Sequence, residues 1–384
     1  MSTVLQRPAD EIGIVFGATL ARGPHDHLRC EVAQHVTWAP ETFLRASLMM
    51  STAQSGGAAE VSVVVPTKDR PALLAATLHS VCRQQDVSIE VVVVDDGSNN
   101  AEAVESVVAE LKNPRVRLLR HPFPEGVSAA RNRGLAATIS EFVAFCDDDD
   151  LWAPNKIARQ LMALDESGCS WVYTGAVDIN HLNAVTKGSP PPTPDTVVAD
   201  LPRFNVIPGG CSGVLAARKV LARVGAFDVE LGPCADWDLW LKLLRVGPPA
   251  YVPEALVGYR LHPANMSLNE ERLVADFTVL RARYGTVNEA TFHRYLFWWS
   301  LRSQRRTAAF RHWLAATRAS DRTFPVRLLG SDLTYLLRNS AKALLSRTKY
   351  GRWAVRPQSA AAPRHEPDPY IAAARQWIAR CELP

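Results

Sequence analysis

Acidic side chains follow two short apolar segments of the sequence, and they are the first candidates for chemistry. Asp95 and Asp96 follow the apolar run 89–94, and four consecutive aspartates at 147–150 follow the run 142–146. Confined carboxylates repel one another, so their pKa values rise unless a cation or hydrogen-bond donors offset the charge. Mg²⁺ or Mn²⁺ binds one or two protein carboxylates and takes water and phosphate oxygens as further ligands. The four aspartates therefore favour a divalent metal site, and a solvated acidic turn that caps the next helix is the alternative.

Four other residues each allow a functional and a structural interpretation. Asp96, which precedes Gly97 and Ser98, fits a ligand contact or an Asx turn. Arg131 fits a phosphate contact or a helix surface. Asp236 fits a reactive carboxylate or a helix N-cap, and His262 fits a metal ligand or an ordinary surface or core histidine. Taken singly, these residues leave both interpretations open.

The hydrophobic pattern predicts the elements that position these residues. Runs 61–66 and 89–94 are typical of buried parallel strands, and Asp69-Arg70-Pro71 predicts a helix start with a capping acid and a first-turn proline. Further strands are expected at 116–119 and 142–146, and a helix at 128–138. Strands that alternate with helices indicate a parallel sheet with helices on both faces, and ligands bind at the carboxyl ends of such strands.

The rest of the chain is predicted in less detail. After Pro154 we expect a helix at 156–164, a strand at 171–174, a strand, turn and helix around 209–210, a helix at 236–246 and a strand at 255–261. The predicted domains are an N-terminal extension (1–58), a catalytic α/β domain (59–270), a basic helical extension (271–356), and a linker with a terminal helix (357–384). Residues 51–57 have a flexible-linker composition, and Met50-Ser51-Thr52 repeats the opening tripeptide, which leaves open a start at Met50.

Composition excludes several classes of protein. With 384 residues, 47% hydrophobic and 21% charged, the chain is not disordered, collagen-like or a coiled coil. No run approaches the roughly 20 apolar residues that span a bilayer, and residues 1–10 lack a signal peptide, so a cytoplasmic protein is expected. Seven scattered cysteines without a C-x-x-C pair predict reduced thiols. Gly-x-Gly-x-x-Gly after a strand and the P-loop motif are both absent, so neither a dinucleotide enzyme nor a P-loop NTPase is supported.

Five motifs occur in order at the predicted strand and helix ends. They are Val-Ser-Val-Val-Val-Pro-Thr-Lys-Asp-Arg-Pro at 61–71, Val-Val-Asp-Asp-Gly-Ser at 93–98, Ser-Ala-Ala-Arg-Asn-Arg-Gly at 128–134, Phe-Cys-Asp-Asp-Asp-Asp-Leu-Trp-Ala-Pro-Asn-Lys at 145–156 and Ala-Asp-Trp-Asp-Leu-Trp-Leu at 235–241. Over about 61–265 the sequence resembles the family 2 inverting glycosyltransferases of the GT-A fold. The resemblance implies a Rossmann-like α/β fold, with a mixed, mainly parallel sheet flanked by helices and followed here by a C-terminal helical extension.

The resemblance also implies roles for individual residues. Pro66 and Asp96 would hold the base and ribose of the nucleotide, and Arg131 would lie near that nucleotide. Asp148 would face the ribose or the sugar. Asp236 matches the catalytic base of the family, although Ala235 replaces the glutamate that commonly precedes that base. The expected ligands of Mg²⁺ or Mn²⁺ are Asp147 and Asp149 of the D-x-D motif, with Asp149 as the principal ligand, and His262.

The implied activity is transfer of a hexose from a nucleotide-diphospho-sugar, with a UDP-sugar as the expected donor. A metal would offset the charge on the departing diphosphate, and the attacking acceptor hydroxyl must lose its proton to a base as the new bond forms. Attack in one step from the far side inverts the anomeric centre. The alternatives are a non-catalytic nucleotide-sugar binding module and a sugar nucleotidyltransferase. The latter usually has a Gly-rich basic loop after the first strand, and Pro-Thr-Lys-Asp at 66–69 is not one.

The segment 290–356 is strongly basic. It holds fourteen Lys or Arg and two acids, interleaved with aromatic and leucine side chains. This mixture fits an interfacial helix on the inner face of an anionic membrane, beside a glycan or lipid-linked acceptor. A helical subdomain that packs on the sheet is the alternative. No nucleic-acid-binding motif accompanies the charge, so nucleic acid is not an expected partner.

Overall fold

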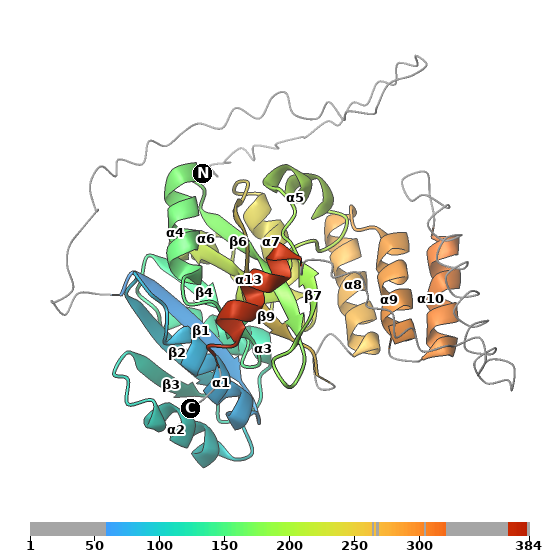
Figure 1. Ribbon diagram of the computed structural model, residues 1–384. Coiled ribbons are helices and arrows are strands. Elements are labelled where there is room, and N and C mark those ends of the chain that lie inside the picture. The colour runs from blue at the N-terminus through green and yellow to red at the C-terminus, as the bar shows by residue number, and fades with distance from the viewer. Residues whose placement is uncertain (1–58, 263–264, 266–268, 303–304, 320–367, 382–384) are drawn as a thin grey trace, which may run out of the picture. The chain divides into compact units, whose positions relative to one another are not determined.

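The computed structural model describes residues 59–262, 265, 269–302, 305–319 and 368–381. The predicted N-terminal extension, the part of the basic segment at 320–356 and the linker up to 367 lie outside these residues. The described chain forms one nine-stranded sheet in the order β3-β2-β1-β4-β8-β6-β9-β5, with β7 paired to β6 (Figure 1).

The N-terminal half of the sheet is parallel. It consists of β1 (Val61–Thr67), β2 (Ile89–Asp95), β3 (Val116–Arg120) and β4 (Phe142–Phe145), connected by α1 (Pro71–Val81), α2 (Ala101–Glu110) and α3 (Val127–Ala136). All seven residues of β1 are buried. Burial on both faces explains why this strand is nearly continuous in valine, because helices cover both sides of a parallel sheet.

The second half of the sheet is mixed. Strand β8 (Val214–Ala217) pairs antiparallel with β4 and with β6 (Trp171–Ile179), which runs parallel to β9 (Ala250–Arg260). The remaining elements of this part are β5 (Leu151–Trp152), α4 (Lys156–Ser167), β7 (Val185–Ser189), α5 (Pro194–Asp200), the 3₁₀ helix η1 (Gly210–Gly213), α6 (Arg218–Arg223) and α7 (Ala235–Leu244). The predicted fold class, a mixed α/β sheet with flanking helices, is confirmed.

The predicted helix cap at Asp69 is wrong, and so are the alternative cap interpretations of the acidic turn 147–150 and of Asp236. The N-cap of α1 is Arg70 and makes no side-chain cap, while the carboxylate of Asp69 accepts hydrogen bonds from the backbone N and the Nδ2 of Asn99. The N-cap of α4 is Asn155 rather than Asp150. The N-cap of α7 is Cys234, so Asp236 lies inside the first turn of that helix. Asp69 and Asp150 instead accept hydrogen bonds from residues distant in sequence, Asn99 and Arg260. The helix α7 begins one residue before Asp236, which therefore cannot be its N-cap.

Among the described residues, four helices follow β9, and the first two share an apolar cluster with the sheet. The four are α8 (Glu270–Tyr284), α9 (Glu289–Arg302), α10 (Arg306–Arg318) and α13 (Pro369–Ile378). Phe277 of α8 and Phe292 of α9 stack at 3.8 Å between ring centroids, and both belong to the apolar cluster that includes Trp240 of α7.

Among the described residues, no helix combines the length and the apolar composition needed to cross a bilayer. The six described cysteines are free thiols, as predicted.

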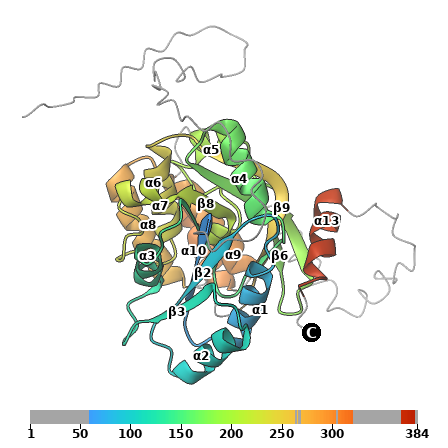
Figure 2. The same cartoon turned by 90° about the vertical axis from the view of Figure 1, so that its left-hand side faces the viewer.

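The helix α13 covers the end of the sheet formed by β6, β7 and β9 (Figure 2). Tyr370 Oη donates to the carbonyl oxygen of Ser189 at 3.0 Å, and Trp377 Nε1 donates to that of Ala255 at 2.9 Å. A Cβ added at Gly175 would stand 2.0 Å from Tyr370 Oη, and one at Gly188 would stand 3.2 Å from the same ring. The two glycines therefore make the space that Tyr370 occupies.

Candidate active site

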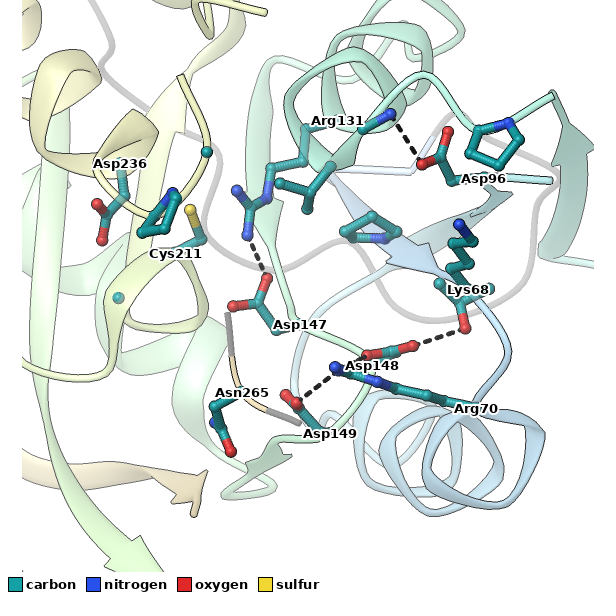
Figure 3. Close-up of a pocket in the computed structure, with 18 of the residues that line it drawn as sticks. Lys68, Arg70, Asp96, Arg131, Asp147, Asp148, Asp149, Cys211, Asp236 and Asn265 are labelled. Atoms are coloured by element: carbon teal, nitrogen blue, oxygen red, sulfur yellow. Dashed lines mark hydrogen bonds and ion pairs between the residues drawn. The ribbon is translucent and has the colours of Figure 1, made fainter. Parts of the chain in front are cut away.

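A pocket of about 440 Å³ opens at the carboxyl ends of β1, β2 and β4 (Figure 3). Because the ends of these parallel strands meet at one edge of the sheet, the pocket collects side chains from distant parts of the sequence. Seven of the eight predicted site residues line it: Pro66, Asp96, Arg131, Asp147, Asp148, Asp149 and Asp236. The eighth, His262, reaches the same region through Asp149.

Asp148 is held on the floor of the pocket by two donors. Thr67 Oγ1 donates to its Oδ2 at 2.7 Å, and Arg70 Nη1 lies 3.2 Å from its Oδ1. Burial and the neighbouring Asp149 raise the pKa of Asp148 to about 7, although Arg70 and Thr67 partly offset this. A cation in the pocket would favour the charged form of this carboxyl.

Asp149 is paired with two basic side chains. Its Oδ2 lies 2.8 Å from Nε2 of His262 and 2.9 Å from Nη1 of Arg70. Burial and the charge of Asp147 raise its pKa, and His262 and Arg70 act in the opposite direction. Asp150 turns away from the pocket, because its Oδ1 accepts the backbone N–H of Arg260.

The donor set fits a divalent cation that shares its shell with a substrate. Within the described residues, no three His, Cys, Asp or Glu side chains converge on one point. The Asp149 carboxylate and the His262 imidazole lie next to each other, with 2.8 Å between Oδ2 and Nε2. Mn²⁺ accepts oxygen and imidazole ligands, and Mg²⁺ needs only one or two protein carboxylates when phosphate oxygens and water complete the octahedron. The pair therefore suits a cation that is completed by a diphosphate.

Arg131 connects the acidic loop to the opposite wall. It is buried on α3, its Nη2 donates to Asp147 Oδ1, and its guanidinium lies 5.2 Å from the centre of the Phe227 ring. The buried Nε has no hydrogen-bond partner among the described residues. Arg131 is thus buried at the pocket wall rather than on a helix surface, and its contact with a nucleotide stays a prediction.

Asp96 ties the loop in front of α3 to the sheet. Its Oδ1 lies 2.8 Å from Nδ1 of His121 and accepts the backbone N–H of Glu125, while its Oδ2 accepts that of Gly126 at 2.9 Å. The predicted Asx-turn alternative is wrong for Asp96, because the carboxylate that accepts the N–H of Ser98 belongs to Asp95. Asp96 therefore shapes the pocket wall, and its contact with a ribose stays a prediction.

Asp236 lies across the pocket from Asp96, on the far side of Asp147 (Figure 3). Its Oδ1 accepts the backbone N–H of Trp237 at 2.6 Å. Burial raises the pKa of Asp236 to about 6, while Arg131 and the Trp237 N–H favour the charged form. A carboxylate of this pKa is ionised at neutral pH and is more basic than an ordinary aspartate, which suits a general base.

Sequence analysis missed several residues of the pocket. Arg70, which pairs with Asp148 and Asp149, was treated only as part of a helix start. Lys68 also lines the pocket, and its side chain is exposed. Asn265 accepts the backbone N–H of His262 through its Oδ1 and so fixes the turn that carries this histidine. Lys68 and Arg70 could have been predicted to line the pocket, because they follow β1 directly and so lie at the same sheet edge as the aspartates.

Comparison with known proteins agrees with this geometry. A family model described as "Glycosyl transferase family 2" matches residues 62–221. The chain is 32% identical over 206 residues to the putative colanic acid biosynthesis glycosyl transferase WcaA of Escherichia coli K12, which covers 51% of this chain and 70% of that protein. It is 26% identical over 212 residues to the UDP-Glc:alpha-D-GlcNAc-diphosphoundecaprenol beta-1,3-glucosyltransferase WfgD of Escherichia coli, covering 55% and 80%.

Solved structures of similar fold include S. aureus TarS, residues 1–349, in complex with UDP-GlcNAc. The TM-score is 0.49 and the sequence identity 19%, over 61% of this chain and 66% of that one.

Proposed function

Because the chain belongs to glycosyltransferase family 2, we propose that it transfers a sugar from a nucleotide-diphospho-sugar to an acceptor hydroxyl, with inversion and with Mg²⁺ or Mn²⁺ bound. The observation that most supports this proposal is that the cation-paired acidic loop 147–149 and the carboxylate of Asp236 line a single pocket. One side of the pocket would take the donor, and the other the acceptor.

The donor side is rich in groups that suit a nucleoside diphosphate. Pro66 and Asp96 would contact the nucleoside, and Asp148 the ribose or the sugar. Asp149 and His262 would hold the metal, which when bound supplies a positive charge that offsets the charge on the departing diphosphate. The guanidinium of Arg131, which lines the same pocket, would donate to a phosphate oxygen of the same leaving group.

The acceptor side contains the base. In the proposed step the acceptor oxygen bonds to the anomeric carbon, the bond from that carbon to the phosphate oxygen breaks, and the proton of the hydroxyl passes to Asp236. The nucleoside diphosphate leaves with the electron pair of the broken bond. Asp147, Asp148 and Asp149 are each paired with an arginine, whereas Asp236 accepts its hydrogen bonds from neutral N–H groups. Of these four carboxylates, Asp236 is thus the one that is not paired with an arginine, which leaves it available to take a proton.

We further propose a cytoplasmic role in cell-surface glycan synthesis, at the inner face of the membrane. The names of the relatives support it, since WcaA is assigned to colanic acid biosynthesis and the name of WfgD contains a lipid-linked acceptor. On α10 the exposed Phe310 stands beside the exposed Arg306 and Arg311, a mixture suited to anionic headgroups. The rest of the basic segment, 320–356, lies outside the described residues.

A screen of donors tests the proposed activity. The purified full chain is incubated with UDP-, GDP- and dTDP-sugars, with MnCl₂ or with EDTA, and the released nucleoside diphosphate is measured. We expect release from one class of donor, and only with the metal. Binding of a donor without any release, with or without an acceptor, would instead support a binding module, and formation of a nucleotide sugar from a nucleoside triphosphate and a sugar phosphate would support a nucleotidyltransferase.

A further inference from the structure

The loop 202–208, between α5 and η1, brings an amide side chain to Asp236. Asn205 Nδ2 lies 3.4 Å from Asp236 Oδ2. The other end of the same amide is occupied, because Asn205 Oδ1 accepts the backbone N–H of Ile207 at 3.2 Å. This local turn fixes which end of the amide faces the carboxylate. The Nδ2 group carries two N–H donors, and the contact with Asp236 uses one of them.

The loop is braced from outside the sheet. Thr286 Oγ1 donates to the carbonyl oxygen of Pro202, and the backbone N–H of Asn288 donates to that of Arg203, both at 2.9 Å. The ring of Phe204 lies 5.8 Å from that of Trp237 and 5.6 Å from that of Tyr295 on α9. The segment between α8 and α9 therefore holds the loop against α7, the helix that carries Asp236.

A glycine lies beside the same oxygen of Asp236. The Oδ1 of Asp236 already accepts the N–H of Trp237, so Oδ2 is the oxygen free to accept a proton. Gly210, which lines the pocket with φ +51°, faces Oδ2, and a Cβ added there would lie 3.6 Å from it. Gly210 and Asn205 are therefore both neighbours of Oδ2, and Gly210 adds no side chain next to it. Ala235, where the family resemblance leads us to expect a glutamate, is fully buried and contributes no polar group beside Asp236.

We propose that Asn205 is a positioning residue for the acceptor: one N–H of its amide holds Asp236 Oδ2, and the other donates to the acceptor sugar next to the reacting hydroxyl. The inference rests on the proposed function and assigns its acceptor side to the loop 202–208. An amide beside the base is suited to a polyhydroxylated acceptor, since it donates to an oxygen of the sugar without taking the proton that Asp236 must accept. The helices that follow the sheet would then act in acceptor recognition through this loop.

Two variants separate positioning from a merely structural role. In Asn205→Asp a carboxylate oxygen still accepts the N–H of Ile207, so the turn is retained, while the donor is lost and a negative charge is added beside Asp236. In Asn205→Ala both the turn and the donor are lost. Arg203→Ala, an exposed side chain two residues away on the same loop, is the control. Transfer is measured with the donor found in the screen and with octyl glycosides of glucose, galactose and N-acetylglucosamine as acceptors, and donor Kd is measured by calorimetry.

We expect kcat/KM for the acceptor to fall about tenfold or more in Asn205→Ala and Asn205→Asp, as for the loss of one hydrogen bond to a charged or sugar group. Donor Kd should stay within about twofold, and Arg203→Ala should match the wild type. If none of the glycosides serves as an acceptor, hydrolysis of the donor by water is measured instead. Its kcat should then be lower in both variants than in the wild type, because Asn205 no longer holds Asp236. An Asn205→Asp variant as active as the wild type would overturn the inference while the proposed function stands. A wild type that releases no nucleoside diphosphate from any donor would overturn both.

Discussion

Asp238 is the residue whose replacement should destabilise the fold most clearly, and its effect can be worked out from three contacts. The side chain is completely buried on α7, two residues after Asp236. Arg283 Nη1 and Tyr284 Oη of α8 each lie 2.7 Å from its Oδ1, and Lys242 Nζ lies 2.7 Å from its Oδ2. In Asp238→Asn the amide oxygen still accepts from α8, but the amide N–H groups face the ammonium of Lys242.

The expected cost follows from breaking a buried ion pair on one side. Removing one partner of such a pair costs about 3–5 kcal/mol, because the other charge stays without compensation. Lys242 and Arg283 are partly exposed, at 21% and 35% of their side chains, so water recovers part of the loss. We therefore expect the free energy of unfolding to fall by about 3 kcal/mol, the lower end of this range. For a chain of this size each kcal/mol lowers Tm by about 2–4 °C, which gives a fall of about 6–12 °C.

Asp228→Asn is the matched control. Asp228 pairs with the same arginine, since its Oδ2 lies 2.6 Å from Nη2 of Arg283, but this ion pair is at the surface. Pairs of this kind contribute about 1 kcal/mol or less. Both variants are melted by circular dichroism, in the absence of added metal. Equal Tm values for Asp238→Asn and the wild type, or an equal fall in the two variants, would refute the reasoning that burial makes the Asp238 contacts costly to break.

The remaining predictions concern the active site and the membrane. Asp149→Ala should abolish Mn²⁺- or Mg²⁺-dependent transfer and leave the metal-free Tm near that of the wild type; full activity of the wild type in EDTA would contradict this. Asp236→Asn should lower turnover by roughly 10²- to 10⁴-fold at unchanged donor Kd, and turnover within a few fold of the wild type would show that another group is the base. Because the pKa of Asp236 is raised to about 6, the ionised fraction falls below pH 6, and kcat/KM of the wild type should then drop about tenfold per pH unit. The full chain should co-sediment with phosphatidylglycerol vesicles, less so at high salt, and Phe310→Ala combined with Arg306→Glu should weaken this; absence of sedimentation on anionic vesicles would remove the membrane interpretation.

Much of the site was predictable because its signals are local. A valine-rich run followed by acids indicates both a buried strand and the edge at which it ends, so Asp96 and the aspartates 147–149 could be placed before any contact was known. Asp236 was harder to place, because an acid near a helix start is typical of a cap. Its order among the other motifs, rather than its own surroundings, indicated a functional role.

The residues that sequence analysis missed act over long distances in the chain. Arg70 and Asp149 are 79 positions apart in the sequence, and Asn205 and Asp236 are 31 positions apart. Contacts between such distant residues produce no periodic pattern in the sequence. The cap predicted at Asp69 was wrong for the same reason, since Asn99 at the end of the neighbouring strand β2 binds its carboxylate. The preference of a residue for a helix cap does not take into account hydrogen bonds that compete from distant parts of the chain.

The contact of α13 with β6, β7 and β9 also affects the order in which the protein folds. Chains are made from the N-terminus, so these strands are available before residues 368–381 have been synthesised. Until then the space beside Gly175 and Gly188 and the apolar side chains of Val177, Ile179 and Ala255 have no cover from α13. A nascent or prematurely terminated chain thus presents an open apolar surface on its sheet, which is the kind of surface that chaperones bind and that promotes aggregation. Loss of the last helix should consequently reduce the yield of folded protein, even though every residue of the pocket is still present.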